Sequence, residues 1–314
     1  MLLKTRHLLL LLHLHEKRSV LRAAEAASMT QPAASKLLAE MEYLVGAPLF
    51  QRHARGIEPT MYGDVLARHA RAALSELTRA EDEIGALRDG RLGQAAVGTV
   101  VNPGTNLVPL AVARVKTAFP SILVRVEMDY SRPLVARLLD GQLDIVIGRI
   151  MDAELADVLQ FERLADEPHA VIARAGHPLG SKGALTHADL ADHGWVVPPE
   201  SSILRARMGT AFMEHDIAWP DNVIETSALP VITALLIESD FLTVLPARSI
   251  SAHVEAGLLQ ILPIDLDVRM EDFGIVRRRH HPLSPAAAHV LAALRETARD
   301  LYGPAPRGAG RARR

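Results

Sequence analysis

The chain has 314 residues, of which 49% are hydrophobic and none is cysteine. This length suffices for two or three domains with real cores, and the lack of cysteine excludes disulfides, thiolate zinc sites and a cysteine nucleophile. The net charge of −2 hides an asymmetry: residues 1–71 hold ten basic and six acidic side chains, a net of +4, which leaves −6 for the rest. A basic head on an acidic body is typical of DNA binding by one end.

The first predicted element is a buried helix within residues 1–18. Its apolar run, Leu8 to Leu12, is too short to span a membrane, and His13 and His15 interrupt it. No small-residue cleavage site follows, and no later segment reaches the length of a transmembrane helix. We therefore expect a soluble, cytoplasmic protein without membrane contact.

Residues 19–45 predict two short helices joined by a tight turn. Ser19 is a good N-cap for the first helix, and Thr30 for the second, with Pro32 in a first turn where a missing N–H costs nothing. Small alanines on both helices allow a close crossing. This pattern indicates a helix-turn-helix, whose second helix projects into a DNA major groove. A basic loop follows, to about residue 60.

Residues 62–89 predict one long helix without proline. Apolar residues alternate in steps of four and three, as in a coiled-coil seam: Leu66, Ala70, Ala73, Leu77, Ala80, Ile84 and Leu87. An amphipathic surface helix is one interpretation. We favour a dimerising coiled coil, because the helix is long and its seam is narrow and rich in small residues. The segment 88–93 then has the composition of a hinge.

Beyond residue 90, predicted strands and helices alternate, which indicates βα units and parallel sheets in an α/β body. The strands are expected at 95–101, 122–128, 143–148, 169–174, 195–198 and 241–246, and the helices at 105–118, 132–140, 203–214, 228–238 and 285–301. The body is long for one sheet. We expect lobe I at about 90–165 and 270–302 and lobe II at about 166–269, crossed near 163–168 and 262–272. Residues 303–314 predict a disordered basic tail; contact of its arginines with nucleic acid is the less favoured alternative.

In this order of parts, the chain resembles the LysR-type transcriptional regulators of bacteria. Thr30-Gln31-Pro32 and the segment from Val45 to Arg52 look like the signature of that family. Body segments that also match are Gly98, Phe119-Pro120, 138–144, His177-Pro178-Leu179 and Leu245-Pro246. The resemblance covers about residues 4–300. It implies a winged helix-turn-helix at 1–61, a linker and dimerisation helix at 62–89, and an effector domain at 90–302 similar to type 2 periplasmic-binding proteins.

Three positions depart from the family pattern. Val20 stands in place of an aromatic residue, and Tyr62 in place of a small one. Ser239-Asp240-Phe241 replaces the usual Gly-x-Gly before Leu-Pro, which alters one wall of the effector pocket. None of these changes affects the residues predicted to contact DNA.

The second helix of the predicted motif carries the candidate base contacts. Gln31 and Ser35 share one face with Lys36 beside them. Glutamine can pair bidentately with adenine, Ser35 can reach a base or a phosphate, and Lys36 can reach a phosphate. The resemblance implies that Gln31 and Pro32 approach base edges. The predicted DNA-binding set is Ser19, Thr30, Gln31, Pro32, Ser35, Lys36, Arg52, His53, Arg55 and Thr60. The last four would supply affinity for DNA and its salt dependence rather than sequence selectivity. The alternative interpretation of the helix residues is that they are exposed polar residues without a role in DNA binding.

Small ligands of a two-lobed body usually bind between the lobes, at strand ends and helix N-termini, where free N–H groups favour an anion. Ser131 matches the effector-contact position of the family. Arg149 would favour a carboxylate or phosphate effector if it pointed into the cleft; a salt bridge is its alternative. The predicted effector set is Val100, Asn102, Thr105, Ser131, Arg149, Ser201, Ser202, Thr226 and Ser227, for which ordinary helix caps are the competing interpretation.

The sequence has no recognisable catalytic or metal-binding pattern. His280-His281 and His13-x-His15 lack a third ligand at helical spacing, and HExxH, GxSxG, P-loop and GxGxxG patterns are absent. We therefore predict that the chain is no enzyme and holds no metal or cofactor besides a small-molecule effector.

Together these features predict a sequence-specific, effector-responsive transcriptional regulator. Its expected partners are double-stranded operator DNA, the effector, RNA polymerase and itself, as a homodimer through the linker helix and, as the resemblance implies, a homotetramer. The competing classes are a transport-type solute-binding protein, an enzyme on the same scaffold and an architectural DNA binder.

Overall fold

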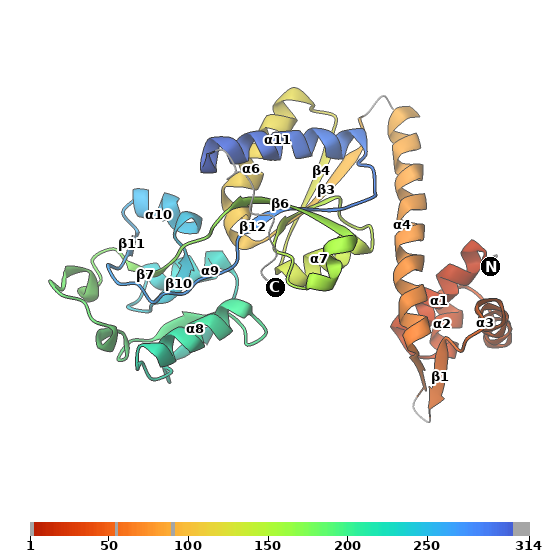
Figure 1. The fold of residues 1–314 in the computed structure, drawn as a ribbon, viewed down its shortest axis with the longest axis horizontal. Coiled ribbons are helices and arrows are strands. Elements are labelled where there is room, and N and C mark those ends of the chain that lie inside the picture. Colours follow the sequence, from red (N-terminus) through yellow and green to blue (C-terminus); the bar gives the residue numbers. More distant parts are fainter. Residues whose placement is uncertain (1–2, 54–55, 89–91, 304–314) are drawn as a thin grey trace.

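The computed structural model describes residues 3–53, 56–88 and 92–303 (Figure 1). A small head, one long helix and a larger α/β body follow one another along the chain (Figure 1). Within these residues, no helix is both long and apolar enough to cross a membrane. The predicted tail lies outside the described residues except for Gly303.

The head packs three helices against a two-stranded wing. Its elements are α1 (Thr5–Lys17), α2 (Val20–Ala26), α3 (Gln31–Val45), β1 (Phe50–His53) and β2 (Gly56–Pro59). Leu10, Leu14 and Met41 are fully buried where α1 meets α3. The Ser19 hydroxyl accepts from the backbone N of Arg22, as expected of a cap. Thr30 is the N-cap residue of α3, as expected, but its side chain makes no capping hydrogen bond. The residues alone predicted a basic loop at the wing, whereas the family resemblance implied a winged helix-turn-helix.

The long helix α4 (Met61–Arg88) belongs to the head at its start and lies beside the body at its end (Figure 1). The Thr60 hydroxyl accepts from the backbone N of Gly63 at 3.2 Å and donates to the Pro48 carbonyl oxygen at 2.7 Å. Thr60 thus caps α4 and ties the start of the helix to the segment before the wing. Further along, Leu77 and Ile84 of the predicted seam are 53% and 58% exposed, so one copy of the chain leaves this part of the seam uncovered.

One part of the body, called lobe I below, is built on a five-stranded sheet in the order β4-β3-β5-β12-β6. Its strands are β3 (Gln94–Thr99), β4 (Leu123–Met128), β5 (Ile145–Gly148), β6 (Leu159–Ala165) and β12 (Phe273–Arg278). Strand β3 is parallel to β4 and β5, whereas β12 is antiparallel to β5 and β6. The expectation of purely parallel sheets is therefore wrong, and β6 and β12 were not predicted.

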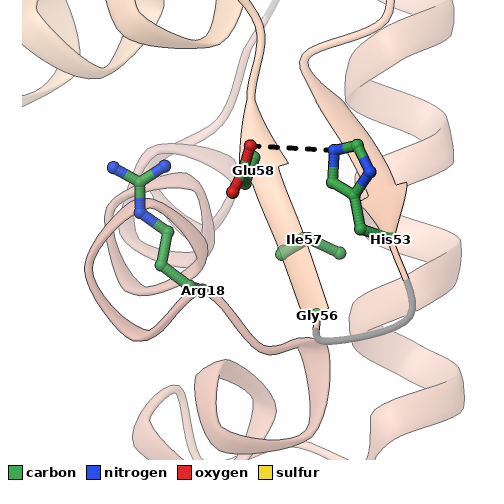
Figure 2. A pocket seen from close by; sticks show the side chains of 5 residues that line it. All are labelled: Arg18, His53, Gly56, Ile57 and Glu58. Carbon is green, nitrogen blue, oxygen red and sulfur yellow. Dashed lines mark ion pairs between the residues drawn. The ribbon is translucent and has the colours of Figure 1, made fainter.

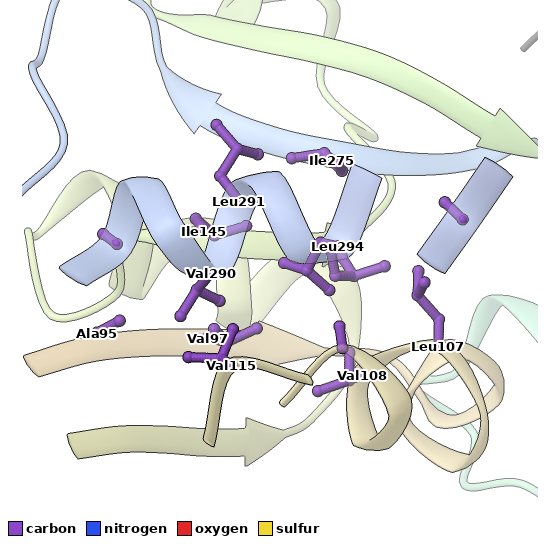
Figure 3. Packing of buried hydrophobic residues seen from close by; sticks show 14 of the residues in the cluster. Ala95, Val97, Leu107, Val108, Val115, Ile145, Ile275, Val290, Leu291 and Leu294 are labelled. Carbon is purple, nitrogen blue, oxygen red and sulfur yellow. The ribbon is translucent and has the colours of Figure 1, made fainter. Parts of the chain in front are cut away.

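Helices cover both faces of this sheet. On one face lie α6 (Leu107–Ala118) and α11 (Pro285–Tyr302), and on the other lies α7 (Ser131–Leu139). Figure 3 shows how Val290 and Leu294 of α11 point toward the sheet and α6. Side chains along β5 alternate between the two cores, because successive residues of a strand face opposite sides.

The rest of the body, called lobe II below, has two smaller sheets and shorter helices. The antiparallel sheet runs β10 (Thr243–Pro246), β7 (His169–Arg174), β11 (Leu259–Ile261), and the parallel pair is β8 (Trp195–Val197) with β9 (Val223–Glu225). The helices are α8 (Ile203–Glu214), α9 (Leu229–Ile237) and α10 (Ser251–Glu255), with 3₁₀ turns η2 (Pro178–Ser181), η3 (His187–Leu190) and η4 (Ala247–Ile250). The chain passes between the lobes twice, from β6 to β7 and from β11 to β12.

Leu294 should be a stability determinant of lobe I. It is fully buried, so Leu294→Ala would leave a cavity and lower the free energy of unfolding by about 2–5 kcal/mol. Urea unfolding followed by circular dichroism measures this loss. Glu296→Ala, on the exposed side of the same helix, is the control and should change it by less than about 0.5 kcal/mol. Equal effects of both variants would contradict this packing.

Acid should destabilise lobe II through His177. Its Nδ1 accepts from the backbone N of Leu179 at 3.2 Å and its Nε2 donates to the Asp240 carbonyl oxygen at 3.3 Å, an arrangement for the neutral ring. Burial lowers the pKa of His177 below the ordinary value of 6.5, so the unfolded chain binds the proton more readily. Stability is therefore full above about pH 6.5 and falls as the pH drops from there toward the folded pKa.

The melting temperature at about pH 7.5 and about pH 5.5 tests this. His177→Asn keeps an acceptor for Leu179 without a titrating ring, so its melting temperature should fall less on acidification. Other buried histidines, such as His169, keep part of the dependence. An unchanged dependence in His177→Asn would refute the assignment.

Candidate DNA-binding and effector sites

The start of α3 presents a polar surface to solvent. Thr30, Gln31, Pro32 and Lys36 are exposed and Ser35 is half-buried, while Ala34 on the opposite side enters the core of the head. The structure thus brings the five predicted residues of this helix onto one surface. A helix that contacts base edges in the major groove does so through exposed polar side chains near its N-terminus, and α3 presents such side chains.

The wing is fixed to the helices rather than loosely attached. The Glu42 carboxylate, on α3, accepts from the backbone N of Leu49 at 2.8 Å. The backbone N of Ile57 donates to the Arg18 carbonyl oxygen at 3.0 Å, and Gly56, at φ +141°, has no room for a Cβ beside that oxygen. These contacts hold the wing and the recognition helix in one rigid arrangement.

Charged side chains of the wing differ in their availability. His53 lies 3.7 Å from Glu58 across the wing (Figure 2), whereas Arg52 is exposed and forms no ion pair within the described residues. Arg55 lies outside the described residues. Ser19 is half-buried at the start of α2, and the hydroxyl of Thr60 is engaged inside the head.

Arg18 is a basic residue that the sequence analysis missed. It ends α1 with φ +52° and borders a small cavity of about 170 Å³ at the wing, with its guanidinium on the far side of β2 from His53 (Figure 2). It is exposed and has no ion-pair partner among the residues that the structure defines. Its position directly before the Ser19 cap was the signal that could have identified it.

In lobe I, three of the predicted effector residues meet at the carboxyl ends of β3 and β5. The backbone N of Arg149 donates to the Ser131 hydroxyl at 3.1 Å. A Cβ at Gly148 would lie 3.2 Å from that hydroxyl oxygen and 3.4 Å from a methyl carbon of Val100. Glycine therefore keeps this small cluster of Val100, Ser131 and Arg149 open.

Asn102 and Thr105 are used differently from the prediction. They lie in a short helix, α5 (Val101–Thr105), and the longer α6 starts only after Asn106. Asn102 is 2% exposed, its side-chain oxygen accepts from the Asn106 amide at 3.0 Å, and the Thr105 hydroxyl donates to the Asn102 carbonyl oxygen at 2.8 Å. The expectation that they flank a free helix N-terminus is wrong.

Arg149 is buried in an ion pair. It is 6% exposed, pairs with Glu167, which is 7% exposed, and donates from Nε to the Glu271 carbonyl oxygen at 2.6 Å. The salt-bridge alternative is thus confirmed, and the reason to expect an anionic effector is lost. Nearby, burial lowers the pKa of His169 even though the Glu167 carboxylate lies 3.9 Å away. No sequence signal linked Arg149 to Glu167, because the partner follows a chain crossing.

The lobe II candidates do not join this cluster by any hydrogen bond among the described residues. Ser202 precedes α8 without a side-chain cap bond, and Thr226 accepts from the backbone N of Ala228 at 3.2 Å, an ordinary local turn. Ser201 and Ser227 are exposed.

A cavity of about 520 Å³ borders Arg149 and is large enough for a small metabolite. Of the predicted effector residues, only Arg149 lines it. The lining residues that the sequence analysis missed include Ile150, Phe161, Glu271, Asp272 and Arg279. Within the described ranges, no group of three His, Asp or Glu side chains is placed to hold a metal ion.

Two family models match almost the entire chain. Residues 5–64 match "Bacterial regulatory helix-turn-helix protein, lysR family", and residues 88–299 match "LysR substrate binding domain". The chain belongs to the LysR family. It is therefore a DNA-binding transcriptional regulator with an effector-binding domain, as the sequence analysis predicted.

The chain is also similar to individual HTH-type transcriptional regulators. HTH-type transcriptional regulator GbpR of Azospirillum brasilense is 38% identical over 295 residues, which cover 93% of this chain and 86% of the relative. HTH-type transcriptional regulator GalR of Pseudomonas putida is 30% identical, with 94% and 74% covered.

Solved LysR-family structures have the same fold. CbnR has a TM-score of 0.62 at 18% identity, with 94% of this chain and 99% of that chain covered. LysG of Corynebacterium glutamicum with bound effector Arg has a TM-score of 0.62 at 17% identity, covering 95% and 99%. The predicted combination of a helix-turn-helix head and a two-lobed α/β domain is confirmed.

Gly63 should be essential for the contact between α4 and the wing. A Cβ there would lie 2.2 Å from the Leu49 carbonyl oxygen, a backbone atom that cannot turn away. Gly63→Ala should therefore destabilise the head by roughly 1–3 kcal/mol.

Gly85→Ala is the matched control for that variant. Gly85 lies in the same helix with nothing within 4 Å of its Cβ position, so alanine should stabilise the helix by up to about 1 kcal/mol. Thermal unfolding of both variants measures the two changes. A loss of the same size in both variants would contradict the assignment of the Gly63 effect to the Leu49 contact.

Proposed function

We propose that two copies of the chain pair through α4 and place two α3 helices on an operator with two half-sites. The exposed polar start of α3, held rigidly beside the wing, is the observation that carries this proposal. Support for pairing comes from Leu77 and Ile84, which one copy leaves exposed on the heptad seam. Two half-sites would lie whole helical turns apart, about 34–36 Å for one turn.

Base contacts belong to Gln31 and Pro32, and phosphate contacts to Ser35, Lys36 and Arg52. We add Arg18 to the phosphate contacts, because it is exposed, basic and next to the wing. His53 and Thr60 contribute less, since each already has an intramolecular partner. The domain boundaries that we propose are 1–61, 62–89 and 90–302.

The effector is proposed to bind between the lobes, at the Val100–Ser131–Arg149 cluster; the adjoining cavity, which residues of lobe I line, would extend this site. A carboxylate effector would have to compete with the buried Glu167 for Arg149. Occupancy would favour one packing of the two lobes over another, since a ligand shifts a conformational equilibrium by its differential affinity. We also propose a homotetramer, action on RNA polymerase and a cytoplasmic location.

A salt series can distinguish the sequence-selective contact of Gln31 from the electrostatic contact of Arg52. A duplex is first selected from a random library with the wild-type chain, and its affinity is then measured by fluorescence anisotropy. Gln31→Ala should weaken selective binding by about 1–3 kcal/mol and reduce discrimination against a scrambled duplex. Arg52→Ala should weaken binding to both duplexes and lower the salt slope by about 1.

Arg299→Ala is the control, because it removes an exposed arginine from α11, in the body. It should leave affinity and slope unchanged. If no duplex is enriched even at low salt, the proposal that paired α3 helices bind an operator of two half-sites is refuted. If Gln31→Ala leaves discrimination intact, α3 does not read the bases.

A further inference from the structure

The middle of α4 faces lobe I through polar groups (Figure 1). The Ser75 hydroxyl donates to the Gly141 carbonyl oxygen at 2.7 Å, and Arg71 lies 3.9 Å from Asp140. The residue after Ser75, Glu76, has its carboxylate 3.1 Å from Arg278 and 3.0 Å from His281. Charged pairs at such half-exposed places contribute little net stability. Further along α4, Arg79 also pairs with the carboxylate of Asp144, which is 4% exposed, so α4 has one buried attachment to lobe I besides these contacts.

The contacts of Arg71 and Ser75 with Asp140 and Gly141 are called the joint below. Two elements of lobe I connect this joint with the Val100–Ser131–Arg149 cluster. Helix α7 begins at Ser131, which binds the backbone of Arg149, and Asp140 directly follows its last residue. Its nine residues span roughly 13 Å. Strand β12 starts next to Asp272, at the cavity, and ends at Arg278, which contacts Glu76.

Both elements are stiff. Leu134 and Leu138 of α7 are fully buried against Val276 of β12 and its neighbours in the sheet. Close-packed interiors shift as units rather than deform smoothly. A displacement at the Ser131 end of α7 therefore appears at its Asp140 end.

On the other side of the joint, Arg71 also contacts the head. Its guanidinium lies 3.2 Å from Nδ1 of His15 in α1, and Nε2 of that ring lies 2.9 Å from Asp64. Arg71 is thus the residue of α4 where head and body side chains meet.

We propose that the Arg71–Asp140 and Ser75–Gly141 contacts are the joint through which the effector site sets the orientation of the DNA-binding head. Helix α7 is the transmitting element, and β12 with Glu76 is the second attachment. Arg71 and Asp140 act as positioning residues without touching effector or DNA. This inference rests on the proposed effector site at Ser131, but not on the identity of the effector.

Pulsed electron spin resonance can measure the joint directly. Because the chain has no cysteine, Glu25→Cys in the head and Glu296→Cys in α11 give two unique, exposed label sites, and dilution with unlabelled chain isolates distances within one copy. The parent should show one narrow distance distribution. Arg71→Asp and Asp140→Arg should each broaden it, and the combined charge swap should narrow it again.

The Arg114–Asp300 ion pair, within lobe I and 2.7 Å long, is the matched control. Arg114→Asp should leave the distribution narrow. If the single swaps at Arg71 and Asp140 leave it narrow too, or if the combined swap stays broad, the joint does not hold the head and the inference is overturned.

Transmission from the effector end needs one further variant. Ser131→Ala removes the hydrogen bond to Arg149, and we expect it to shift the head-to-body distance in the parent but not in the Arg71→Asp background. A shift in both backgrounds, or in neither, would refute transmission through this joint. DNA binding of the same proteins to the selected duplex is scored separately, so failure of the proposed function is recognised independently of the distance result.

Discussion

The insertion of the first turns of α4 into the core of the head constrains the rest of the molecule. Gly63 lies against the Leu49 carbonyl, Thr60 ties the helix start to Pro48, and Ala67 and Ala70 are buried among the head helices. Because α4 continues unbroken for 28 residues, roughly 42 Å, its far end cannot move without turning the recognition helix. The orientation of the head is thus a property of whatever holds α4, namely lobe I and, in the proposed dimer, a second copy.

Between the lobes, the decisive interaction is a buried ion pair. Arg149 directly follows β5 of lobe I, and Glu167 lies in the crossing segment between β6 and β7, so the pair holds the segment that enters lobe II against lobe I. Separating two charges at such a buried position is unfavourable unless new partners replace them. The pair therefore favours one packing of the lobes, and an effector that changes this packing would have to supply those partners or leave the pair intact.

Local signals predicted α3, α4 and α8 well, because hydrophobic periodicity and capping residues depend only on the sequence of the helix itself. Strands β6 and β12 escaped prediction because their strand character depends on distant pairing, such as Val276 with Phe161. Of the predicted effector residues, Val100 and Arg149 directly follow β3 and β5, and Ser131 at the start of α7 lies beside them. The role of Arg149 could not be predicted, because only the folded chain brings Glu167 to it. Asn102 was predicted to contact the effector because its hydrogen-bond partner, Asn106, was not recognised from the sequence.

Hydroxyl-radical footprinting of the full-length chain on its selected duplex tests the central claim, that paired chains present two rigid recognition heads to DNA. The account predicts two protected patches whose centres lie a whole number of helical turns apart, with the adjacent phosphates of each half-site covered by the wing. A single short patch, or even protection along the whole duplex, would contradict it.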